Sequence, residues 1–106
     1  MDNKQIYGVG FRTSGTAVAT SVTATKAIPT GAVTIYITDI SASSDVGTAT
    51  VQIRDNAVSI WENTISATVP YSFNFNQPIP ATGTVTVVVA GASASLKTAN
   101  ISGYTI

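Results

Sequence analysis

The chain has 106 residues, with five basic and five acidic side chains, and therefore no net charge at neutral pH. It contains neither cysteine nor histidine, which excludes disulfides, thiolate or histidine metal sites, and catalysis by a cysteine nucleophile or a histidine base. The absence of a net positive charge also argues against a nucleic-acid binder or a polybasic membrane-surface protein, because both must neutralise phosphates.

The apolar composition favours β-structure. There are 12 valines and 11 isoleucines against one leucine and one methionine, and β-branched side chains suit a pleated sheet better than a helix. The length fits one domain with its own core. We therefore expect a single domain over residues 1–106, in which residues 1–5 form a frayed end or a flexible arm that reaches a neighbour.

Alternation of apolar and polar residues predicts about eight short strands. In chain order these are residues 5–12, 16–26, 32–40, 48–54, 57–62, 71–75, 84–90 and 96–106. The segment 63–69 is ambiguous. No large apolar side chain fills the strand at 16–26, so we expect it at an edge or close against a neighbouring surface.

Turn-forming residues separate these strands. Thr13-Ser14-Gly15 predicts a turn, and the polar residues 39–47 predict the longest loop. Asp55-Asn56 predicts a two-residue hairpin turn, since both residue types tolerate left-handed backbone. The small residues 91–95 predict another loop.

The stretch from Tyr71 to Ala90 organises the predicted fold. Its two strands are expected to be antiparallel neighbours in the core, separated by a loop at Pro78 and Pro80. The segment 84–90 is uncharged and flat, and would aggregate if it lay at an edge. We therefore place it inside a sheet with a neighbour on each side.

The number and spacing of strands predict an all-β fold. It is an antiparallel β-sandwich of about eight strands, jelly-roll-like, with an immunoglobulin-like sandwich as the alternative. No run of 18 apolar residues could span a membrane, and residues 1–10 lack the apolar run of a secretory signal.

No pattern of acidic residues predicts chemistry. The acidic residues are Asp2, Asp39, Asp45, Asp55 and Glu62, and all but the first fall at or near predicted strand ends, where acids are common. Asp39 and Asp45 share one serine-rich loop, but two carboxylates make a poor calcium site. We predict no catalytic residue, no metal and no cofactor.

Exposed aromatic side chains are the candidates for an interface. They are Trp61, Tyr36, Tyr71 and Tyr104. Trp61 alternates with Val58 and Ile60, which leaves two readings: it faces away from the core and is exposed, or it lies at the rim of a sheet and packs under a loop. Such rings could serve protein contacts, where aromatic residues are enriched, or could stack on a sugar ring.

In its short strands of valine, isoleucine and threonine and its few charges, the chain resembles small virion proteins of tailed bacteriophages, the head-decoration or cement proteins. The resemblance lies in the segments TGAVTIYITDIS, TATVQIRD, YSFNFNQPIPA, TVTVVVAGAS and NISGYTI, and spans roughly residues 17–106. It implies a non-catalytic homotrimer on the capsid surface of a virion, bound to the major capsid protein or other virion subunits.

The main hypothesis is therefore a capsid-decorating structural protein, with no nucleic-acid or membrane partner. The low charge and the absence of catalytic residue types support it. One alternative is a carbohydrate-binding or adhesin-like module that uses Trp61 and the tyrosines, and another is a domain of a tail or fibre protein.

Overall fold

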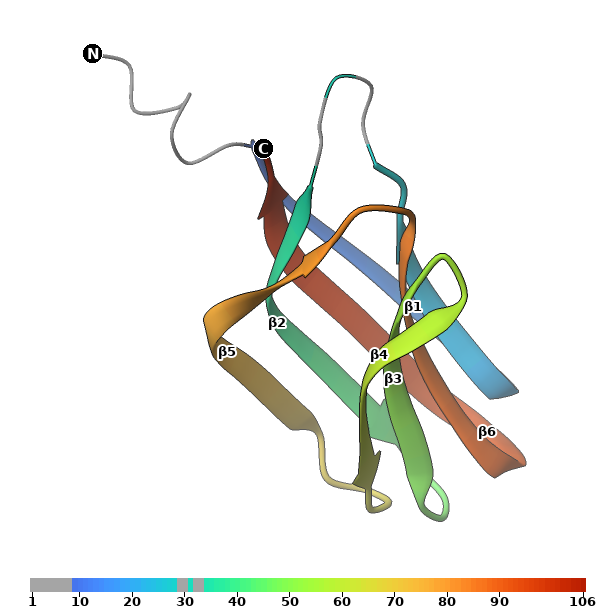
Figure 1. Cartoon of the computed structure of the whole chain (residues 1–106). Helices are drawn as coiled ribbons and strands as arrows, with labels where there is room; N and C mark the ends of the chain where they lie inside the picture. Colours follow the sequence, from blue (N-terminus) through green and yellow to red (C-terminus); the bar gives the residue numbers. More distant parts are fainter. Residues whose placement is uncertain (1–8, 29–30, 32–33) are drawn as a thin grey trace.

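The computed structural model describes residues 9–28, 31 and 34–106, which form six strands and no helix. The strands are β1 (Val9–Lys26), β2 (Ile35–Ser44), β3 (Ala49–Asp55), β4 (Val58–Ile65), β5 (Tyr71–Ala81) and β6 (Val85–Thr105) (Figure 1). Every pairing is antiparallel. The predicted all-β fold is confirmed. In the described part of the chain, no helix has the length and apolarity to cross a membrane.

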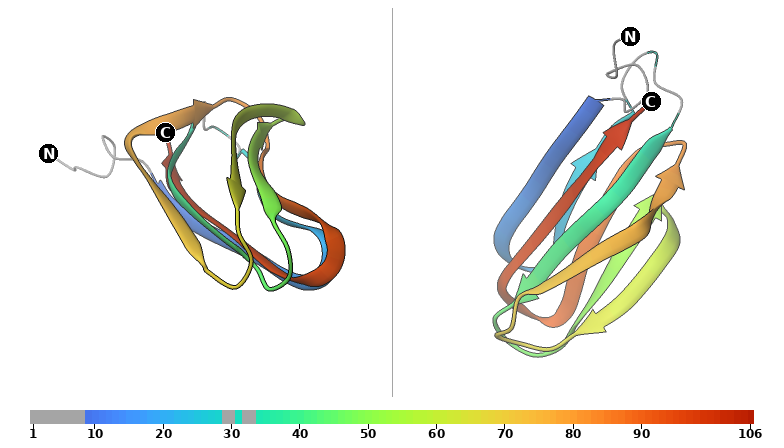
Figure 2. Two further views of the ribbon diagram at one scale, coloured as in Figure 1. Left: turned by 90° about the horizontal axis from the view of Figure 1, so that it is seen from below. Right: turned by 90° about the vertical axis from the view of Figure 1, so that its left-hand side faces the viewer.

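Strand β6 is the centre of the sheet. The order is β4-β3-β6-β2-β5, with β1 also paired to β6. The first part of β6 pairs with β3 and its last part with β2, while β1 follows it along the other edge. Because β1 and β6 bend together, one curled sheet folds over into two layers (Figure 2). The first layer holds β5, β2, the last part of β6 and the first part of β1, and the second holds β3, β4 and the first part of β6.

The bend explains why six strands replace the eight that were expected. The predicted turn at residues 13–15 is wrong, because β1 is continuous there and pairs with β6 through Gly15. A Cβ on Gly15 would lie 2.1 Å from the Thr23 carbonyl oxygen. Glycine is therefore needed for a close approach between the two halves of β1. The predicted loop at 91–95 is likewise part of β6.

A buried lysine holds the bend of β6. Lys97 is fully buried, and its Nζ donates to the carbonyl oxygens of Ala19, at 2.8 Å, and Ser93, at 2.7 Å. A third bond, of 2.8 Å, goes to Oγ of Ser95. All three donors of the ammonium group thus have acceptors, and they tie β1 to the two sides of the bend.

The core lies between the two layers. Its largest apolar members come from β2, β3, β4 and β6, and are Ile35, Ile37, Val51, Ile53, Ile65, Val85, Val87, Val89 and Ile101. On β1, Val22 and Ala24 are buried whereas Val18 is 70 % exposed. The register shift between Ala19 and Ser21 inverts the alternation, since one residue more or less turns every following side chain to the other face.

One predicted loop is shorter than expected and one predicted turn is displaced. Strand β2 continues to Ser44, so that Asp39 lies within a strand and not in a loop. The β3–β4 turn is centred on Asn56 and Ala57, whose φ angles are 49° and 71°, one residue beyond the predicted Asp55-Asn56.

The Tyr71 to Ala90 stretch is arranged differently from the prediction. Strand β5 pairs with β2, and β2 lies between β5 and β6. The two strands of the stretch are therefore not neighbours. Pro78 and Pro80 lie within β5, which an edge strand tolerates because proline lacks only a donor. The segment 85–90 does lie between two neighbours, β1 and β3, as predicted. Residues 1–5 are outside the described residues.

Candidate functional site

The outer face of the first layer carries a row of polar side chains that crosses four strands. The register places Arg12 of β1 opposite Ser102 of β6, Ser102 opposite Asp39 of β2, and Asp39 opposite Asn74 of β5. We call these four residues the polar row. Neighbouring strands are about 4.8 Å apart, so the row extends over about 14 Å.

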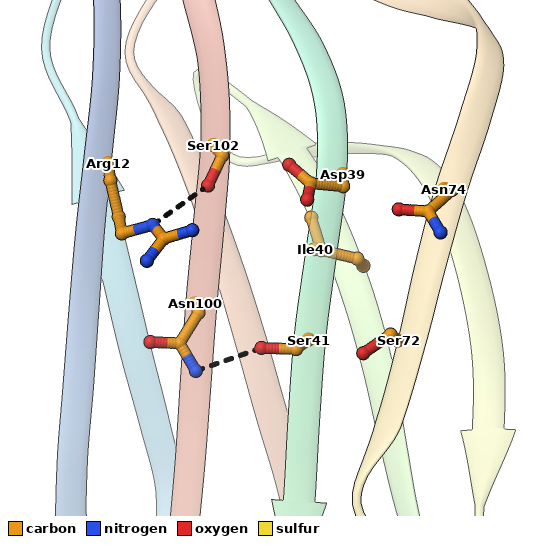
Figure 3. Close-up of a pocket in the computed structure, with 8 residues that line it drawn as sticks. All are labelled: Arg12, Asp39, Ile40, Ser41, Ser72, Asn74, Asn100 and Ser102. Atoms are coloured by element: carbon orange, nitrogen blue, oxygen red, sulfur yellow. Dashed lines mark hydrogen bonds between the residues drawn. The ribbon is translucent and has the colours of Figure 1, made fainter.

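A second row of polar side chains lies beside it. Asn100 of β6 is opposite Ser41 of β2, which is opposite Ser72 of β5. These three residues, the polar row and Ile40 line a shallow hollow of about 380 Å³ (Figure 3). We call it the polar hollow.

Few of the polar side chains of the hollow form hydrogen bonds with one another. Two hydrogen bonds join the residues drawn in Figure 3: Nε of Arg12 donates to Oγ of Ser102 at 3.4 Å, and Nδ2 of Asn100 donates to Oγ of Ser41 at 3.0 Å. Asn74 and Ser72 take part in neither, and both are exposed. Amide, hydroxyl and charged groups of the hollow can therefore form hydrogen bonds with a ligand.

The outer face of the second layer has a different character. There Nε of Arg54 donates to Oε1 of Gln52, at 2.9 Å, and Nε2 of Gln52 donates to Oε1 of Glu62. The long polar side chains of that face bind one another in a chain. Both faces carry polar side chains, but those of the second layer bind one another, whereas Asn74 and Ser72 of the hollow take part in neither hydrogen bond drawn there.

Two of the predicted interface residues meet beside the hollow. Tyr36 of β2 and Tyr104 of β6 are register partners, and their rings stack with centroids 5.1 Å apart. Tyr104 is two residues from Ser102, and therefore on the same face of β6. Both rings are half-buried. The stacked pair forms an aromatic border to the polar row.

The other two predicted interface residues lie elsewhere. Trp61 packs edge-on against Phe73 and Phe75, with centroids 4.9 and 5.6 Å apart, and Tyr71 stacks on Phe73. All four rings pack against the core. The reading in which Trp61 faces away from the core is wrong, because a register shift opposite Ile53 and Arg54 makes Trp61 the partner of the buried Ile53.

The acidic residues have separate places. Asp39 lies in the hollow, where Oδ1 accepts a bond from the Thr38 hydroxyl. Asp55 accepts from the backbone N–H groups of Thr82 and Gly83, so that it joins the β3–β4 turn to the β5–β6 connection. Within the described ranges, no three acidic side chains cluster as a metal site would require.

Sequence reasoning missed most of the hollow. Arg12, Asn74 and Asn100 each occupy an outward position on a strand, where a polar residue is ordinary. Only the cross-strand register brings them together, and the sequence contains no signal for it beyond the alternation itself.

Comparisons with known proteins give structural likenesses at low identity. No protein-family model matches the chain, and no curated protein matches it. The fold is similar to the crystal structure of PirA, with a TM-score of 0.50, 13 % identity, and coverage of 89 % of this chain and 94 % of that one.

Two carbohydrate-binding modules are also similar in fold. One is the module CBM36 in complex with calcium and xylotriose, at a TM-score of 0.49 and 16 % identity, covering 86 % of this chain and 78 % of that one. The other is the CBM36-1 domain of a multidomain xylanase from the hindgut metagenome of Trinervitermes trinervoides. Its TM-score is 0.46 at 12 % identity, with coverage of 81 % and 74 %.

These comparisons correct the main functional hypothesis. The prediction of a capsid-decorating protein is not upheld: no family model or curated protein supports it, and the three similar structures named above are PirA and two carbohydrate-binding modules, not virion proteins. The β-sandwich part of the prediction stands. The predicted homotrimer, capsid partner and virion location are tested by no observation and stay predictions.

Proposed function

We propose that the chain is a carbohydrate-binding module that binds a polysaccharide in the polar hollow without modifying it. The observation that carries the proposal is the polar hollow bordered by the stacked pair Tyr36 and Tyr104. The ligand class follows from the chemistry of the groups gathered there.

The polar side chains suit a polyhydroxylated ligand. Each sugar hydroxyl can both donate and accept, and the hollow offers side chains of each kind: a carboxylate in Asp39, an amide in Asn74 and Asn100, and a guanidinium in Arg12. A few polar groups fixed on rigid elements give orientation and specificity. Strand residues in a sheet meet that requirement.

The shape of the site favours a chain laid across the sheet. The side chains that line the hollow come from four adjacent strands (Figure 3), and the polar row extends over about 14 Å by strand spacing. A small metabolite would need a deeper pocket that covers most of its surface. A polysaccharide can make the same contacts from one side.

The aromatic border adds an apolar contact. Tyr36 and Tyr104 keep part of their rings exposed, and a half-exposed aromatic ring gives a ligand apolar area together with a polar hydroxyl. The axial C–H groups of a sugar ring can lie on such a surface while its hydroxyls bind the polar row.

The test is a binding panel of soluble polysaccharides, read by affinity electrophoresis and isothermal titration calorimetry. The double variant Asn74→Ala/Asn100→Ala removes two amides from the hollow, and we expect at least a ten-fold loss of affinity, about 1.4 kcal/mol. Gln52→Ala on the outer face of the second layer is the matched control and should bind normally. If no polysaccharide binds, or if the double variant binds like the parent, the proposal is wrong.

Trp61 serves as a fold reporter in this panel. Because its ring packs against Phe73 and Phe75 and the core, we expect its fluorescence to remain unchanged when a polysaccharide binds. The same signal shows whether each variant is folded.

A further inference from the structure

The guanidinium of Arg12 is the one cationic group among the residues that line the polar hollow. Its hydrogen bond from Nε to Oγ of Ser102 is long, at 3.4 Å. In Figure 3 the guanidinium of Arg12 lies between β1 and β6, with one terminal nitrogen turned toward β6. The guanidinium nitrogens form a planar fork that matches the two oxygens of a carboxylate.

Gly10 lies two residues from Arg12 on β1, and we call the space above Gly10 and beside Tyr104 the slot. Tyr36 covers one face of the Tyr104 ring, and the register places Gly10 beside Tyr104 on its other side. Among the residues that the structure describes, the nearest contact of a Cβ built on Gly10 would be the Gly103 oxygen, at 3.8 Å. A sugar ring can therefore lie above Gly10 against the free face of Tyr104, within one row of Arg12.

Asp39 limits how many negative charges the ligand can carry. It lies two strands from Arg12 in the polar row, or about 10 Å by strand spacing. A carboxylate beside Arg12 is attracted by the guanidinium, whereas a second carboxylate close to Asp39 would be repelled. The charges of the row thus prefer an acidic unit at β1 and neutral units toward β2 and β5.

From this arrangement we infer that the ligand is a polysaccharide with spaced uronic acids, whose carboxylate binds Arg12 while its sugar ring occupies the slot above Gly10. The inference rests on the proposed function and names its ligand class. Neutral hydroxyl groups of the following units then face Asp39 and Asn74.

The experiment compares probes that differ in charge. Glucuronoxylan and hyaluronan carry spaced glucuronic acids, and their carboxyl-reduced forms keep the backbone without the charge. Polygalacturonate carries a carboxylate on every unit. We expect at least one spaced-acid probe to bind about ten-fold more tightly than its reduced form, as a charge-assisted hydrogen bond pair would give, and more tightly than polygalacturonate.

Matched variants assign the effect to Arg12. Arg12→Gln should lose that ten-fold preference, so that the acidic and the reduced probe bind it with equal affinity. Arg54→Gln removes an arginine from the outer face of the second layer and should change neither. Asp39→Asn should raise the affinity for polygalacturonate several-fold, because it removes the repulsion.

A size series at position 10 tests the slot. Gly10→Ala should bind almost normally, and Gly10→Leu should lose binding while remaining folded, since its side chain fills open space and not the core.

The outcomes separate the two claims. Equal affinity for acidic and reduced probes, or an Arg12→Gln variant that keeps its preference, overturns this inference and leaves carbohydrate binding intact. Normal binding by a folded Gly10→Leu variant overturns the claim that a sugar ring occupies the slot above Gly10. Failure to bind any of the probes or any polysaccharide of the panel overturns both proposals.

Discussion

Tyr36 and Tyr104 stack across β2 and β6 with ring centroids 5.1 Å apart and planes inclined by 21°. Their side chains are neighbours only because the register pairs residues 68 positions apart in the chain. The stack orients the Tyr104 ring, and the register places Gly10 on the side of Tyr104 away from Tyr36. One ring of the pair thus supports the other at the border of the polar hollow.

We predict that Tyr104→Leu weakens polysaccharide binding more than Tyr36→Leu does. Either change removes an aromatic pair worth about 1 kcal/mol of stability, but only Tyr104 lies beside the slot. Calorimetric titration of both variants against the best-binding polysaccharide gives the comparison. A Tyr104→Leu variant that is folded and binds like the parent would contradict this role.

Replacement of Lys97 by methionine should destabilise the fold strongly. Methionine keeps the apolar length of the side chain, but the acceptors on Ala19, Ser93 and Ser95 lose their donor. A buried polar group without a partner costs about 1–3 kcal/mol. Ser95 is buried, whereas Ser93 is exposed and its carbonyl can bind water, so we expect a loss of about 1–3 kcal/mol in the free energy of unfolding.

Urea denaturation followed by Trp61 fluorescence measures the Lys97 effect. Lys26→Met is the control, because Lys26 lies over the Phe11 ring at 5.2 Å and such a cation–π contact contributes only about 0.5–1 kcal/mol near the surface. Similar losses in both variants would show that the ammonium group does not hold the bend.

Asp55→Ala should destabilise the end of the sandwich where two connections meet. Its carboxylate accepts from the backbone N–H groups of Thr82, at 3.2 Å, and Gly83, at 2.9 Å. Charge-assisted bonds of this kind contribute about 1.5–3 kcal/mol. Denaturation midpoints should therefore fall for Asp55→Ala and fall less for Asp55→Asn, which keeps one acceptor oxygen. Equal stability of Asp55→Ala and the parent would exclude this role.

Ala57→Gly should stabilise the protein. Ala57 has a φ of 71°, a left-handed conformation that costs an L-residue with a Cβ about 1–2 kcal/mol but is free for glycine. We expect a net gain of about 1 kcal/mol, because glycine also gives the unfolded chain more freedom. A thermal melt detects it as a rise in Tm. The same change at Ala67, outside the left-handed region, should destabilise or have no effect.

The sequence alone determined the fold class and much of the core. Alternation of β-branched residues at Ile35 and Ile37, and at Val85, Val87 and Val89, is sufficient to predict strands with one buried face, because side chains in a strand point alternately to opposite sides. The uncharged segment 85–90 was correctly placed between two neighbours for a similar reason, since its exposure at an edge would be unfavourable.

Only the tertiary structure decided where alternation is interrupted and which strands are neighbours. The register shifts beside Val18 and Trp61 inverted the expected faces, and a shift of one residue leaves almost no trace in local composition. The polar hollow depends on the same information. Arg12, Asp39, Asn74 and Asn100 are ordinary outward residues on four strands, and long-range pairing through β6 is what makes them one site.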